Sequence, residues 1–134
     1  MKTRKYKLQN NKTKKNKHLL PIMNPIFNLR EIAIQLLLLE DHLFQKGKRC
    51  CDCILKHIYT IEGLLDEGIS LDKKMKYFKL FQNIQKKFYN IAKILEPAVK
   101  NKHLTDDICI SSAQKLRKIR KPLVKMTAGL INKY

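Results

Sequence analysis

The chain has 134 residues, 44% of them hydrophobic, which is enough for one domain with a modest core. It contains no run of about 18 apolar residues and no apolar segment of the secretory type near residue 1, so we expect an intracellular protein of the cytoplasm or nucleus, without a membrane span. The net charge of +18 predicts attraction to polyanions, either nucleic acid or an acidic partner protein.

Residues 1–25 lack hydrophobic periodicity and contain two prolines, so we expect a disordered basic tail that becomes ordered only on a partner. Without the eight basic residues of segment 1–18, the chain keeps 21 basic and 11 acidic residues, a net charge of +10. The basic residues of the tail are Lys2, Arg4, Lys5, Lys7, Lys12, Lys14, Lys15 and Lys17. The remainder, residues 26–134, is the predicted folded domain.

The first predicted helix begins at Asn28 and ends at Gly47. Glu31, three residues after Asn28, completes a capping-box pattern. The main apolar positions follow one another in steps of three and four residues, and three further positions widen the same face. The main positions are Leu29, Ile32, Leu36, Leu39 and Leu43, and the wider face adds Ile34, Leu37 and Leu38.

Three more helices are predicted after short turns. The second covers about residues 50–68, and the third covers about residues 72–96 with Ser70 as its cap. The fourth starts at Thr105, and we expect Pro122 to kink or divide it.

The third predicted helix carries the firmest periodicity, and Pro97 is expected to end it. Its apolar positions, four and three residues apart, are Tyr77, Phe81, Ile84, Phe88, Ile91 and Leu95. No strand pattern and no internal repeat occurs in the sequence. Short connections between amphipathic helices predict an all-α fold, a small antiparallel bundle of about four helices.

Residues 49–57, "RCCDCILKH", hold three of the four cysteines and one of the four histidines. On a helix, Cys50, Cys53 and His57 lie on one face over two turns. Two thiolates and an imidazole suit tetrahedral zinc, and we expect His42 of the first helix to face Cys53 and complete the set. The sequence therefore predicts a zinc ion bound by these four residues. The possible substitutes for His42 are Cys51, His103 and Cys109.

Two other interpretations use the same cysteines. Cys50 and Cys53 lie in the first turn of a helix, where the dipole favours thiolate, so the pair could cycle between dithiol and disulfide as a thiol oxidoreductase. Flavin-linked oxidases of this size carry a tryptophan and a histidine–asparagine motif, and thioredoxin-type proteins need a βαβ unit; the sequence shows none of these. The cysteines could also be small side chains buried against a neighbouring helix.

Glu40 and Lys56 are expected at the same level of the helical hairpin. They could form an ion pair, or Glu40 could orient His42 or His57 at the zinc site; a solvated helix face is the simpler alternative. No nucleophile, phosphate-binding loop or carboxylate pair accompanies them, and zinc with four protein ligands has no open position. We therefore expect a protein that is not an enzyme.

The fourth predicted helix offers the best basic surface for a polyanion. Its basic residues are Lys115, Arg117, Lys118, Arg120, Lys121 and Lys125. The aromatic residues Tyr77, Phe81 and Phe88 are expected in the core, where they cannot stack on bases, so nucleic acid would be bound through phosphates without sequence preference. The alternative is a structural protein held by acidic protein partners only.

Three segments resemble a small helical family found among large DNA viruses and some phages. They are "LLEDHL" at residues 38–43, "RCCDCILKH" at residues 49–57 and "IEGLLDEGISLD" at residues 61–72, and they lie in the run of residues 27–72, about a third of the chain. The family pattern has no settled activity to transfer, and the basic tail and Cys51 depart from it. The resemblance implies a viral protein that acts inside the infected cell or is carried in the virus particle.

Overall fold

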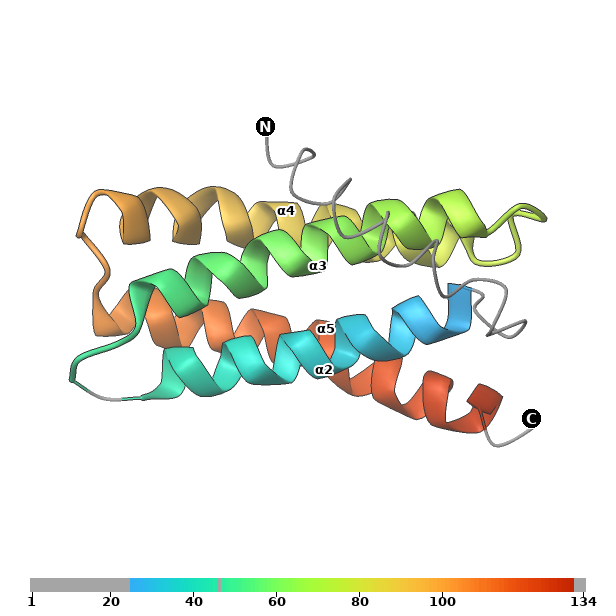
Figure 1. Ribbon diagram of the computed structural model, residues 1–134. Coiled ribbons are helices and arrows are strands. Elements are labelled where there is room, and N and C mark those ends of the chain that lie inside the picture. The colour runs from blue at the N-terminus through green and yellow to red at the C-terminus, as the bar shows by residue number, and fades with distance from the viewer. Residues whose placement is uncertain (1–24, 46, 132–134) are drawn as a thin grey trace.

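The computed structural model describes residues 25–45 and 47–131, and within these ranges the chain is all-α (Figure 1). The four helices are α2 (Pro25–Phe44), α3 (Cys51–Leu71), α4 (Phe78–Lys100) and α5 (Asp106–Ile131). They pack antiparallel, which confirms the predicted fold class. The predicted disordered tail, up to residue 24, lies outside the described residues.

Each helix packs against two neighbours, in the cyclic order α2, α3, α4, α5 (Figure 1). Consecutive helices are therefore adjacent, and the first and last described helices also meet. In this arrangement α2 lies diagonally across the bundle from α4, and α3 lies across from α5. One long side of the bundle is formed by α4 and α5, and the opposite side by α2 and α3.

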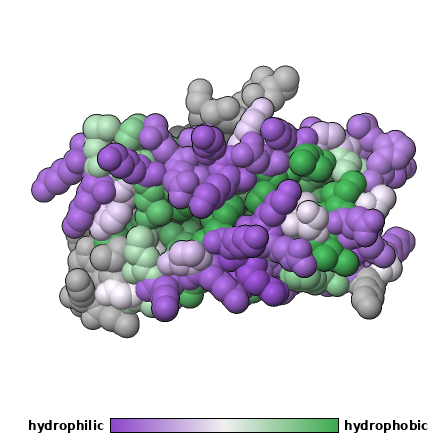
Figure 2. Space-filling model, turned by 180° about the vertical axis from the view of Figure 1, so that it is seen from behind, coloured by the Kyte–Doolittle hydropathy of each residue, from purple (hydrophilic) through white to green (hydrophobic). Residues whose placement is uncertain are grey.

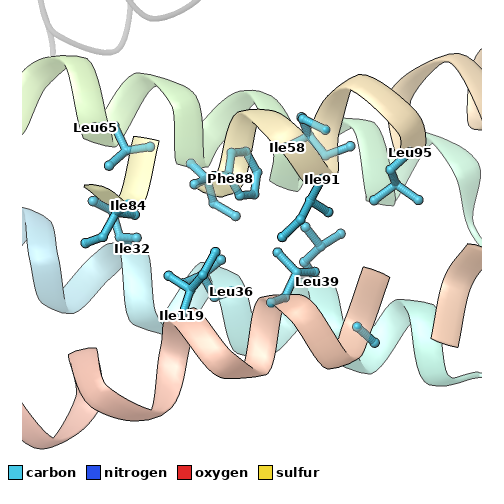
Figure 3. Close-up of a cluster of buried hydrophobic side chains, with 14 of the residues drawn as sticks. Ile32, Leu36, Leu39, Ile58, Leu65, Ile84, Phe88, Ile91, Leu95 and Ile119 are labelled. Atoms are coloured by element: carbon cyan, nitrogen blue, oxygen red, sulfur yellow. The ribbon is translucent and has the colours of Figure 1, made fainter. Parts of the chain in front are cut away.

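The core is built from aliphatic side chains and two phenylalanines that point inward from all four helices (Figure 3). The main positions predicted for the first helix are all buried, and so are the positions predicted for the third helix from Phe81 to Leu95. A regular spacing of apolar residues thus located the buried sides of α2 and α4 correctly.

The three residues expected to widen the buried face of α2 are instead exposed. Ile34, Leu37 and Leu38 lie on the outer side of the helix, so that prediction is wrong. A helix at one corner of a four-helix bundle buries the sides that face the centre and its two neighbours, and its outer side stays in solvent.

The start of α2 also differs from the prediction. The helix begins at Pro25, a residue suited to the first helical position because its missing N–H would have no partner there. Asn28 is therefore inside the helix and buried, and it does not form a capping box. Its side-chain amide donates to the carbonyl of Leu64 and to Oε1 of Glu67, both at 3.0 Å, and so joins α2 to α3.

The turn between α3 and α4 is organised by Asp72, which does not start a helix. Its carboxylate accepts the backbone N–H of Lys76 at 3.0 Å and that of Tyr77 at 2.9 Å, and α4 begins only at Phe78. Ser70 lies within α3 and is not the cap that we expected. The buried carboxylate of Asp72 satisfies donors that the helix start would otherwise leave unpaired.

Two prolines lie inside helices. Pro97 does not end α4, and Pro122 does not divide α5. Each proline leaves the carbonyl four residues earlier without an intrahelical donor, and those carbonyls belong to the exposed residues Lys93 and Lys118, where water can reach them. The predicted start of the fourth helix at Thr105 is confirmed to within one residue, and the Oγ1 of Thr105 accepts the backbone N–H of Ile108 in the first turn of α5 at 3.2 Å.

Gly68 of α3 packs directly against the ring of Phe81 of α4. It is buried, and a Cβ atom at this position would lie 2.5 Å from Cε1 and 2.6 Å from Cζ of Phe81. Gly129 in α5 is the contrasting case, because a Cβ atom there would meet no atom within 4 Å.

We expect Gly68→Ala to lower the free energy of unfolding by about 2 kcal/mol, because overpacking of the Phe81 ring outweighs the higher helix propensity of alanine. Gly129→Ala is the matched control and should be neutral or stabilising by up to about 1 kcal/mol. Chemical denaturation of both variants measures the difference. A Gly68→Ala protein as stable as the parent chain would contradict the close packing of these two helices.

Candidate functional site

The first turn of α3 holds Cys50 and Cys53, which are joined by a disulfide bond in the structure. Cys50 is the N-cap residue, with extended backbone angles, and its sulfur accepts the N–H of Cys53 at 3.2 Å. Cys50 is exposed and Cys53 is half-buried. The bond therefore lies at the surface, at the positive end of a helix dipole.

Arg49 anchors the loop in front of this disulfide. Its Nε donates to the carbonyl of Leu43 at 3.1 Å, and its Nη1 lies 2.7 Å from a carboxylate oxygen of Asp106. The side chain of Arg49 is only 7% exposed. It thus ties the α2–α3 loop to the first turn of α5, a structural role that the sequence pattern did not reveal.

His42 and His57 lie side by side between α2 and α3, with ring centroids 5.1 Å apart. Nδ1 of His57 donates to Oε1 of Gln35 at 2.7 Å, whereas within the described part of the chain the buried Nδ1 of His42 has no hydrogen-bond partner. Burial lowers the pKa of His57, and the positive charges of His42 and Lys56 lower it further. The imidazole of His57 is therefore kept neutral more readily than a histidine in water.

The structure does not bring the four predicted zinc ligands into one tetrahedral set. The cysteine sulfurs are bonded to each other, and among the described residues no three His, Cys, Asp or Glu side chains are grouped to hold a metal ion. The predicted ligand set includes the thiolates of Cys50 and Cys53, so zinc binding stays a prediction for the reduced chain. Of the possible substitutes, Cys51 and His103 are exposed, and Cys109 is buried in α5, where burial raises the pKa of its thiol.

The prediction for Glu40 is wrong. Its carboxylate is 1% exposed and points to α5, where Oε2 accepts from Nε of Arg120 at 2.5 Å and Oε1 accepts from Nη2 of the same residue at 3.2 Å. Nε of Arg117 lies 3.4 Å from Oε1 of Glu40. Residues two apart on a helix differ by about 200° in direction, so Glu40 cannot orient His42, and Lys56 stays exposed on α3 without pairing with it.

These contacts change the basic surface predicted for α5. Arg120 is turned inward to Glu40, and Arg117 divides its contacts between Glu40 and the ring of Phe44, whose centroid lies 5.0 Å from the guanidinium carbon. The four lysines predicted for this surface remain exposed. They are Lys115, Lys118, Lys121 and Lys125. The basic residues of the tail lie outside the described residues.

A groove of about 360 Å³ runs between α4 and α5 and gathers three lysines from the two helices. We call it the α4–α5 groove; its lining residues are Lys87, Asn90, Ile91, Lys115, Lys118 and Ile119. Figure 2 shows this side of the bundle, where hydrophilic side chains of both helices flank a hydrophobic strip. Lys87 was not among the residues predicted for the basic surface, because only the packing of α4 against α5 places it in one groove with Lys115 and Lys118.

No helix in the described ranges is both long and apolar enough to cross a membrane. Comparisons of the chain with protein-family models, with curated proteins and with solved structures find no match. The viral family therefore remains a resemblance.

Loss of the Glu40 charge should destabilise the bundle. We expect Glu40→Gln to lower the free energy of unfolding by about 2 kcal/mol, because it leaves the half-buried guanidinium of Arg120 without its anion. Lys56→Gln is the control, because it would destabilise the protein only if Glu40 paired with Lys56 across the hairpin. It should change the free energy of unfolding by less than about 0.5 kcal/mol. Equal effects of the two substitutions in chemical denaturation would contradict the Glu40–Arg120 pairing.

The state of the Cys50–Cys53 pair should decide whether zinc binds. We expect the oxidised chain to bind no zinc and to show only the thiols of Cys51 and Cys109 as free, and we expect the reduced chain to bind one zinc ion that His57→Gln releases. Metal analysis and thiol titration of both forms measure this. A reduced chain that binds no zinc but exchanges with glutathione would contradict the zinc prediction and leave the dithiol interpretation.

Proposed function

We propose that this protein is a non-enzymatic binding module that holds nucleic acid by its phosphates on the side of the bundle formed by α4 and α5. The observation that carries the proposal is the α4–α5 groove, where Lys87 of α4 meets Lys115 and Lys118 of α5. These side chains come from two neighbouring helices, so the packing of α4 against α5 places them along one groove before a ligand arrives.

The electrostatics of this side favour an anion. No acidic residue lines the α4–α5 groove, and the further exposed lysines of α5, Lys121 and Lys125, extend the positive surface along the helix. The two carboxylates of the first turn of α5, Asp106 and Asp107, do not line this groove, although Asp107 and Lys115 line the adjoining one. Lysine is a compact, strongly hydrated point charge that suits phosphate contacts.

The residues that line the same groove are not suited to sequence-specific recognition of bases. Its lining residues include no aromatic side chain on which a base could stack, and Phe81 and Phe88 are buried in the core. Contacts made by lysine alone go to phosphates and carry no sequence information. The proposed module therefore binds duplex nucleic acid without sequence preference, and its affinity comes mainly from counterion release.

The salt dependence of duplex DNA binding tests this proposal. The triple variant Lys87→Gln, Lys115→Gln, Lys118→Gln should flatten the slope of log affinity against log salt by about 2 to 3, because each lost phosphate contact contributes about 0.9. The control variant Lys56→Gln, Lys73→Gln, Lys74→Gln removes the same charge from exposed positions elsewhere and should change the slope by less than about 1. A truncated chain without residues 1–18 measures how much the basic tail contributes to the salt dependence.

Two results would contradict the proposal. If the intact chain does not bind duplex DNA at about 50 mM salt, the alternative of acidic protein partners, as in a virus particle, becomes the better account. If both triple variants lose the same slope, binding depends on net charge alone and the α4–α5 groove is not the site.

A further inference from the structure

The outer side of α2 is unusually apolar for a helix surface in this chain. Ile34 is 39% exposed, Leu37 is 43% exposed and Phe44 is 37% exposed. The helix contains no lysine, and its single arginine stands against three acidic residues, in a chain whose net charge is +18. Such a surface is typical of an interface with another protein.

The residues on this outer side follow a regular pattern, which we call the α2 stripe. They are Phe27, Arg30, Ile34, Leu37, Asp41 and Phe44, alternately three and four residues apart. This spacing places them in one line along the helix, and it is the spacing of a coiled-coil seam. The line lies on the opposite side of α2 from Leu29, Leu36 and Leu43, which fill the core.

The α2 stripe is also symmetric about its own middle, between Gln35 and Leu36. Phe27 and Phe44 are equally far from this point, and so are Ile34 and Leu37. Reversal of the helix about its middle therefore exchanges each apolar residue of the stripe with another apolar residue. The two charged positions, Arg30 and Asp41, are equally far as well and have opposite signs. Within the described part of the chain, neither of these two side chains takes part in an ion pair.

We propose that two copies of this chain form a symmetric dimer through the α2 stripe, with the two α2 helices antiparallel. A two-fold axis through the middle of the stripe sets Ile34 against the partner's Leu37, and Arg30 against the partner's Asp41. Each apolar side chain then meets an apolar one, and each charge meets its opposite. A stripe that is complementary to itself when reversed fits a second copy better than an unrelated partner.

Charge distribution supports this choice of surface. Two copies with a net charge of +18 repel each other, and an approach through α4 and α5 would bring their lysines together. An approach through α2 meets a helix without lysine and buries the exposed Ile34 and Leu37. A groove of about 460 Å³ between α2 and α5, lined by Leu37, Val124 and neighbouring residues, leaves room beside the stripe for the partner's side chains. The dimer also leaves the α4–α5 groove uncovered, so it does not depend on the proposed function.

Sedimentation velocity of the full, nuclease-treated chain at about 300 mM salt tests the dimer. We expect a species of twice 15.8 kDa, and we expect Leu37→Asp to raise the dimer dissociation constant by at least about tenfold. The matched control is Ile94→Asp, which alters an equally exposed apolar residue of α4 and should leave the dimer intact. Circular dichroism and denaturation check that each variant is folded.

A charge exchange tests the antiparallel register. Arg30→Asp and Asp41→Arg should each weaken the dimer by about tenfold, because each places like charges opposite one another at two points of the interface. The double variant restores the opposite charges and should return the dissociation constant to within about threefold of the parent value. A monomeric parent chain at about 100 μM, equal weakening by Ile94→Asp, or a double variant as weak as the single ones would overturn the proposal.

Discussion

The buried carboxylate of Glu40 fixes how α2 is turned about its own axis, and the other features of the bundle follow from that orientation. Glu40 is held by Arg120 and by Arg117, which are 80 and 77 residues away in the sequence. With this side of α2 directed at α5, His42 is directed at α3 and the α2 stripe faces outward. A rotation of α2 that kept Glu40 buried but turned it away from α5 would leave its charge without a partner, which is strongly destabilising.

The same pairing divides the basic residues of α5 into two groups. The arginines compensate a buried anion and help to close the ring of helices, so they belong to the structure. The lysines are exposed and remain available to a ligand. Guanidinium groups, which bind a carboxylate through two parallel hydrogen bonds, suit the first role, and ammonium groups suit the second. The molecule thus has a basic side on α4 and α5 and, on α2, a stripe whose one positive and one negative charge cancel.

Sequence periodicity predicted the helices and most of the core, because burial repeats locally every three or four residues. It could not predict which side of α2 faces α5, since that depends on Glu40 meeting residues of a distant helix. It also assigned Ile34 and Leu37 to the core, because an apolar residue looks the same whether it faces the bundle or a partner. The sequence located the cysteine pair of the candidate site correctly. It did not predict that His42 lies beside His57 rather than Cys53, because the register of the α2–α3 hairpin differs from the expected one.

The central claim is that phosphates bind on α4 and α5 and not on α2 or α3. Nuclear magnetic resonance of the ¹⁵N-labelled chain, titrated with a short DNA duplex, tests it residue by residue. The account predicts that amide signals around Lys87, Lys115 and Lys118 shift during the titration while those of α3 stay unchanged. Shifts confined to α2 and α3, or no shifts in the folded bundle, would contradict it.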